Sequence, residues 1–108
     1  MDNIIVMVME PEGVWEEKVI PNTLEALQEL VGGYIEAIRI HNELIVIVDE
    51  EGKLKNKQTN MYLPGDRLVG TVVVVGENGE EFADCPEGFR KCMKGKACGL
   101  LGWLRKPC

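Results

Sequence analysis

The sequence predicts an α+β domain with a mostly antiparallel sheet and one packed helix. Hydrophobic residues make up 45% of the 108 residues, which suits a single globular domain. Short stretches rich in Ile and Val alternate with turn residues, as in sheets of antiparallel strands. Residues 24–31 show apolar side chains at three- and four-residue spacing, the pattern of a helix with one apolar face.

The first two strands lie at the beginning of the chain. Residues 3–9 are apolar after Asn3, which is typical of a strand buried on both faces. Residues 11–13, Pro-Glu-Gly, predict a turn. Residues 15–20 alternate in part and predict a second strand that returns beside the first.

The predicted helix has recognisable signals at both ends. Asn22 or Thr23 would cap its first turn, because either side chain can accept a hydrogen bond from a free backbone N–H. Gly32 and Gly33 would end it, because glycine adopts the left-handed backbone conformation at little cost.

The remaining strands follow the helix. Residues 34–40 alternate between two faces and residues 44–48 return after a turn, so they predict a hairpin. Residues 53–65 are polar and predict a long loop. The valine-rich residues 67–75 predict the last long strand, and residues 80–82 a short edge strand.

Charge and cysteine content change together near residue 84. Residues 1–84 hold 6 basic and 17 acidic residues, a net charge of −11, whereas residues 85–108 hold 6 basic and 1 acidic, a net charge of +5. We therefore predict an α+β body, residues 1–84, and a basic C-terminal appendage, residues 85–108. The appendage either lies across the acidic body or binds an acidic partner, an anionic surface or nucleic acid.

The sequence also bears on location. The apolar stretches are much shorter than the roughly 20 residues that cross a membrane. Asp2 and Glu10 do not fit a secretory signal, which begins with basic residues and continues with a longer apolar segment. We expect a cytoplasmic protein that binds no membrane, with mostly reduced thiols.

Three stretches of the body carry a family resemblance. They are LVGGYIE at residues 30–36, VDEEGKL at residues 48–54 with Asn60 after it, and GTVVVVG at residues 70–76. In this order they resemble the DUF3846 family of uncharacterised proteins, over roughly residues 3–84. The resemblance implies a product of a bacteriophage or another mobile element, where small proteins that blunt host defence are common. It implies no catalytic residue and no cofactor.

The four cysteines all lie in the predicted appendage and are separated by six, five and nine residues: Cys85, Cys92, Cys98 and Cys108. A structural zinc site usually presents a close pair of ligands, which this spacing lacks. Three interpretations stay open: unpaired thiols in a poorly packed tail, which we favour, a zinc site, or two disulfides. Cations flank Cys92 and would stabilise its thiolate, but the one histidine, His41, falls in a predicted turn, so no general base is indicated.

The long polar loop is the candidate ligand-binding segment. In an extended chain Lys53, Lys55 and Lys57 point the same way, and later residues add hydrogen-bonding groups. The loop would close a pocket against the sheet, lined by Tyr34, Lys53, Lys55, Asn60 and Tyr62. Such cations suit the phosphates of a small nucleotide, although no glycine-rich phosphate loop is present. A simple surface loop is the other interpretation.

Carboxylates also gather near predicted turns, at residues 16–17, 49–51 and 80–81. A solvated acidic surface is the interpretation we favour. The alternative is an array that mimics DNA phosphates and sequesters a DNA-binding enzyme. The same negative charge disfavours nucleic acid as a partner of the body.

We therefore predict a non-catalytic binding protein without a cofactor. It would counteract host defence by sequestering a small nucleotide signal or by binding a host protein. The alternatives are a zinc- or redox-dependent module built on the four cysteines, and an acidic DNA mimic. The sequence leaves the oligomeric state open, including a homodimer.

Overall fold

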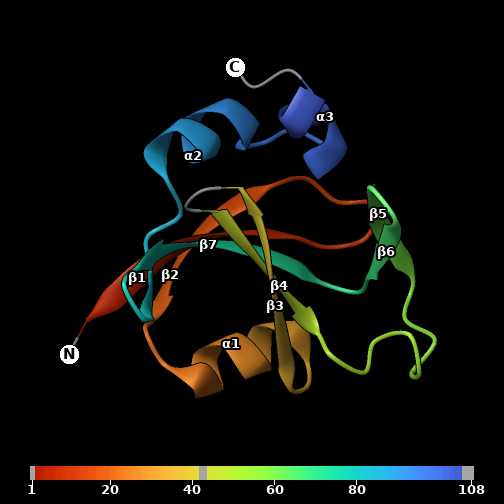
Figure 1. Cartoon of the computed structure of the whole chain (residues 1–108), viewed down its shortest axis with the longest axis horizontal. Coiled ribbons are helices and arrows are strands. Elements are labelled where there is room, and N and C mark those ends of the chain that lie inside the picture. The colour runs from red at the N-terminus through yellow and green to blue at the C-terminus, as the bar shows by residue number, and fades with distance from the viewer. Residues whose placement is uncertain (1, 42–43, 106–108) are drawn as a thin grey trace.

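The computed structural model, which describes residues 2–41 and 44–105, is an antiparallel sheet with helices on both faces (Figure 1). Six strands form the main sheet in the order β2-β1-β7-β4-β3, and β8 pairs with β7. These strands are β1 (Asn3–Met9), β2 (Glu16–Pro21), β3 (Ile35–His41), β4 (Leu44–Asp49), β7 (Val72–Asn78) and β8 (Glu81–Ala83). Every strand pair between described residues is antiparallel, so the predicted α+β fold class is confirmed.

The central strands are apolar on both sides because both faces of the sheet are covered. All six residues of β4 are buried. On one face, β4 and β7 pack against α1 (Leu24–Val31) through Leu27 and Val31. On the other face they pack against α2 (Glu87–Met93) and α3 (Leu100–Arg105), through side chains that include Phe89 and Leu100. Near-continuous apolar strands are the expected consequence of this double burial.

Helix α1 begins and ends as its sequence predicts. The Thr23 side chain is the cap, and its Oγ1 accepts a hydrogen bond of 3.1 Å from the N–H of Ala26. Gly32 has a φ of 80° and donates its N–H to the carbonyl of Gln28, which ends the helix in a left-handed turn.

The polar loop is shorter than predicted, because part of it forms a second small sheet. Strand β5 (Thr59–Leu63) pairs with β6 (Asp66–Val69) through a turn at Gly65, where φ is 75°. Met61 and Leu63 alternate into the core, which gives this hairpin its buried side. The long strand predicted over residues 67–75 is therefore wrong: it is divided at Gly70, whose φ of 74° ends β6.

The predicted appendage supplies part of the core. Cys85, Phe89, Met93 and Leu100 are all buried and belong to the same apolar cluster as β4 and β7. Trp15, 1% exposed, joins this segment to the β1–β2 loop, because its indole N–H donates 2.9 Å to the carbonyl of Cys98. The interpretation of a poorly packed tail is thus wrong for the described residues 85–105.

Charge contributes to the same packing. Arg90 and Lys94 lie 3.8 and 3.9 Å from the carboxylate of Glu17 on β2. Residues of the basic segment therefore lie against the acidic body, which is the intramolecular interpretation of the charge asymmetry. None of the helices in the described residues is long and apolar enough to span a membrane.

The body is predicted not to fold without residues 85–108. Deleting them would expose the face of the sheet that Phe89, Met93 and Leu100 cover. Burial of each large apolar side chain contributes about 1.5–3 kcal/mol, and the whole domain has only about 5–15 kcal/mol to lose. We expect residues 1–84 to show no cooperative urea transition in circular dichroism.

A point substitution gives the matched test in the full chain. Phe89→Ala should lower the free energy of unfolding by about 3 kcal/mol, whereas Leu54→Ala, at a side chain 83% exposed, should leave it unchanged. A cooperative transition of residues 1–84 at wild-type denaturant concentration would instead establish the body as an independent domain.

Candidate functional site

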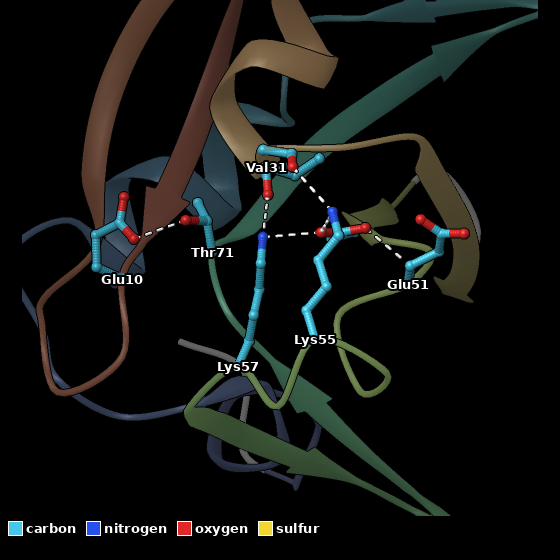
Figure 2. Close-up of polar contacts among 8 residues, drawn as sticks. Glu10, Val31, Glu51, Lys55, Lys57 and Thr71 are labelled. Atoms are coloured by element: carbon cyan, nitrogen blue, oxygen red, sulfur yellow. Dashed lines mark hydrogen bonds and ion pairs between the residues drawn. The ribbon is translucent and has the colours of Figure 1, made fainter.

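The most ordered polar arrangement in the candidate loop is a lysine–aspartate cluster, formed by Asp49, Lys55 and Lys57. Asp49 is the last residue of β4, and its side chain is only 1% exposed. The Nζ atoms of Lys55 and Lys57 each lie 2.8 Å from its Oδ2. Its Oδ1 accepts a 2.8 Å hydrogen bond from the backbone N–H of Glu51. Figure 2 shows both lysines extending from the loop toward the end of α1.

The same two lysines serve the C-terminus of α1. Lys57 Nζ donates 2.8 Å to the carbonyl of Val31, and Lys55 Nζ donates 3.2 Å to the carbonyl of Gly32. The last carbonyls of a helix lack partners within the helix and carry partial negative charge. The last turn of α1 contains no basic residue. The loop therefore supplies the cations that this helix end does not supply itself.

Two glycines make room for the cluster. A Cβ at Gly33 would lie 2.7 Å from both Asp49 Oδ1 and Lys55 Nζ. A Cβ at Gly70 would lie 2.8 Å from Lys57 Cδ, and the φ of Gly70 is also positive. All three sequence stretches that carry the family resemblance thus meet around these side chains. Gly33 and Gly70 are therefore explained by the close approach of the cluster side chains.

The electrostatics of the cluster fix Asp49 as an anion. Burial by itself raises the pKa of Asp49, but hydrogen bonds from Lys55 and Lys57 and from the N–H of Glu51 lower it to about 2. A carboxyl group with this pKa stays ionised at neutral pH. It is therefore poorly suited to donate or accept a proton in catalysis.

The structure places the predicted lysines in internal contacts. Lys55 belongs to the cluster. Lys53 Nζ lies 2.8 Å from Oδ1 of Asp66 on β6, and this ion pair lowers the pKa of Asp66. Sequence reasoning missed Asp49 as the partner, because it regarded residues 49–51 as a solvated acidic turn.

The other predicted residues do not converge on a pocket. Asn60 Nδ2 donates 2.8 Å to the carbonyl of Met9 and 2.7 Å to that of Gly70, so this amide ties β5 to the ends of neighbouring strands. Tyr34 and Tyr62 are 66% and 58% exposed. The five predicted residues are therefore divided between structural contacts and open surface.

A small cavity does lie between the end of β4 and β6. Its volume is about 90 Å³, well below the roughly 300 Å³ of the smallest usual ligand pockets. Both cations of its lining have partners: Lys53 pairs with Asp66, and Arg67 donates to the Thr59 hydroxyl. The charged residues that line the cavity are Glu36, Asp49, Glu50, Lys53, Asp66 and Arg67. Carboxylates outnumber cations there, which disfavours an anionic ligand.

The cysteines differ from one another. Cys85 is a buried free thiol, and burial raises its pKa to about 12, against the lowering effect of Arg90. Cys98 is an exposed free thiol, and Cys92 is disulfide-bonded. Among the described residues, no group of three or more histidine, cysteine or acidic side chains is arranged to hold a metal. Cys108 lies outside the described residues, so the zinc site stays a prediction.

The observed features define a small α+β domain in which one loop closes a helix end over a buried carboxylate. The model of the DUF3846 family, a domain of unknown function, matches residues 2–95, and the chain belongs to this family. The match extends beyond the predicted limit at residue 84 and includes α2. None of the curated proteins and none of the solved structures compared with the chain matches it.

The cluster is predicted to make stability depend on pH. Because the pKa of Asp49 is lowered to about 2, its stabilising contribution is complete above its ordinary pKa, near 4, and is lost as the pH falls toward 2. Asp49→Asn should lower the free energy of unfolding at pH 7 by about 3 kcal/mol, because the lysines lose a buried anion. This deficit should shrink between pH 4 and pH 2 in urea titrations.

Asp66→Asn is the matched control for that experiment. It removes an ion pair whose side chains are 39% and 55% exposed, so it should cost less than about 1 kcal/mol. Equal losses in the two variants would contradict the structural role of the cluster.

The two free thiols are predicted to differ in reactivity. In native protein Cys98 should react readily with an aromatic disulfide reagent, whereas Cys85 should react only after unfolding. The absorbance of the released aromatic thiol should rise in a fast phase. This phase should be lost in the Cys98→Ser variant and kept in the Cys85→Ala variant. A fast phase that survives Cys98→Ser would show that another cysteine is accessible in the native protein.

Proposed function

We propose that this protein is a non-catalytic domain that acts by binding another protein. The observation that carries the proposal is the engagement of Lys55 and Lys57 by Asp49 and by the end of α1. These loop lysines were the main reason to expect a small anionic ligand. With both committed internally, a macromolecular partner is the better supported of the two forms of binding.

A nucleotide would have to take the cluster apart. Its phosphate would displace Asp49 from two lysines, which would leave a carboxylate 1% exposed without its counter-charges. Such a buried, unpaired charge costs about 3–5 kcal/mol. The adjoining cavity of about 90 Å³ offers little contact in return.

The surface supports a protein partner more readily. Several large apolar side chains stay in solvent although the core is well filled, including Leu54 at 83% and Tyr62 at 58% exposure. Aromatic and apolar side chains of this kind are typical contact residues of protein interfaces. In the mobile-element setting that the family resemblance implies, the partner would be a cytoplasmic host protein and its inhibition would counteract host defence.

Nucleotide binding and protein binding can be distinguished by two measurements, a thermal-shift assay and capture of a host protein. A nucleotide present at 100 times its Kd would add about 2.7 kcal/mol and raise the Tm of a domain this size by about 10 °C. We expect a panel of mono-, di- and cyclic nucleotides to produce no shift. We also expect the full chain to capture a host protein that, once purified, forms a stoichiometric complex with it.

Substitutions at exposed positions provide the control. If Leu54 or Tyr62 contributes to the interface, Leu54→Ser or Tyr62→Ser should weaken this complex while leaving the Tm of the free protein unchanged. A large Tm shift with any nucleotide, together with no purified partner, would refute the proposal.

A further inference from the structure

A groove runs between the start of α1 and the β7–β8 hairpin, away from the lysine–aspartate cluster. It consists of two adjoining hollows with volumes of about 230 and 440 Å³. The first lies between Leu24 and residues 80–82, and the second continues past Phe82 toward Asp2 and Asp84. Both are lined by Asn22, Glu81 and Phe82. We call this feature the acidic groove.

The first hollow of the acidic groove has an apolar side that is held in place. Leu24, the first residue of α1, is 51% exposed. It lines the first hollow together with Leu27 and Phe82. Asn22 fixes the adjoining segments, because its Nδ2 donates 3.1 Å to the carbonyl of Phe82 and its N–H donates 3.0 Å to that of Asp2. An apolar side chain of a partner would meet a preformed contact surface.

The charged residues of the groove are all acidic. They are Asp2, Glu80, Glu81 and Asp84, and no lysine or arginine of the described chain lines either hollow. One carboxylate oxygen of Asp84 already has a partner, because its Oδ1 accepts a hydrogen bond from the backbone N–H of Ile5. Within residues 2–41 and 44–105, the carboxylates of Asp2, Glu80 and Glu81 have no hydrogen-bond or ion-pair partner.

Several acidic residues elsewhere in the fold do have cationic partners. Asp49 is paired with two lysines, Glu17 with Arg90 and Lys94, and Glu77 with Arg39. The cations of α2, Arg90 and Lys91, do not reach the groove, because α2 covers the opposite face of the sheet (Figure 1).

We propose that the acidic groove binds a basic, amphipathic peptide segment of a partner protein. An apolar side chain of the segment would pack between Leu24 and Phe82, and a neighbouring lysine or arginine would pair with Glu80 and Glu81. Charge complementarity identifies this class of partner, because phosphates and acidic peptides would be repelled from the same residues. The inference rests on the proposed function only in taking the partner to be a protein.

The test uses labelled peptides of twelve residues and the full-length protein. One peptide combines arginine with leucine, a second replaces the arginines by glutamate, and a third replaces the leucines by serine. Fluorescence anisotropy at low salt should show tightest binding of the first peptide, weaker binding of the third and none of the second. Binding should weaken as the salt concentration rises.

Variants locate the interaction. Glu80→Gln/Glu81→Gln should weaken binding of the first peptide about fivefold to tenfold, since two exposed ion pairs are lost. Leu24→Ser should weaken it by a similar factor. Glu50→Gln/Glu51→Gln removes the same charge from another exposed acidic pair and should stay within about twofold of wild type. Circular dichroism would verify that each variant keeps the wild-type Tm.

Two results of the peptide experiments would overturn the inference. One is equal binding of the basic and acidic peptides, and the other is an equal loss in the groove variant and its charge-matched control. Binding measurements with a purified host partner distinguish failure of the groove inference from failure of the proposed function. A purified partner that binds Glu80→Gln/Glu81→Gln as tightly as wild type would refute the groove and leave protein binding in place. Peptide binding that depends on the groove, together with the absence of any host protein partner, would refute the proposed function and leave the groove inference in place.

Discussion

A carboxylate buried at the end of β4 constrains much of this fold. An ionised Asp49 can be buried only where opposite charge reaches it, because an unpaired buried charge costs several kcal/mol. Lys55 and Lys57 meet this requirement and at the same time satisfy the last carbonyls of α1. One small cluster therefore couples a strand end, a helix end and the loop between β4 and β5. Gly33 and Gly70 follow as consequences, since larger residues would collide with these side chains.

The second constraint is the apolar character of the central strands. Strands β4 and β7 present Ile and Val to both sides of the sheet, so a single helix cannot complete the core. Helices α2 and α3 cover the second face, and an aromatic chain connects them to the β1–β2 loop. Phe89 meets Trp15 and Trp103 edge to face, with ring centroids 5.4 and 5.2 Å apart. The described part of the C-terminal segment thus completes the core on the second face of the sheet.

Local signals could be predicted from the sequence, and non-local pairings could not. The spacing of Leu27 and Val31 and the Thr23 cap define α1 within one short window. Strand β5 was missed because only Met61 and Leu63 mark its buried side. The four-residue spacing of Phe89 and Met93 is a helix signal. The prediction for this segment rested on its charge and cysteine content and did not use that spacing. Nothing local shows that Lys55 and Lys57 belong to Asp49 and not to a ligand.

The distribution of cations links these constraints to function. The body has 6 basic and 17 acidic residues, and at least four of those cations are taken up by Asp49, Asp66 and Glu77. Arg90 and Lys94 of the basic C-terminal segment lie near Glu17. The carboxylates of Asp2, Glu80 and Glu81 are left without counter-charges among the described residues, beside the apolar side chains of Leu24 and Phe82. Because the fold uses much of its positive charge in internal ion pairs, the groove is left negative, and the partner that we propose for it would supply the positive charge.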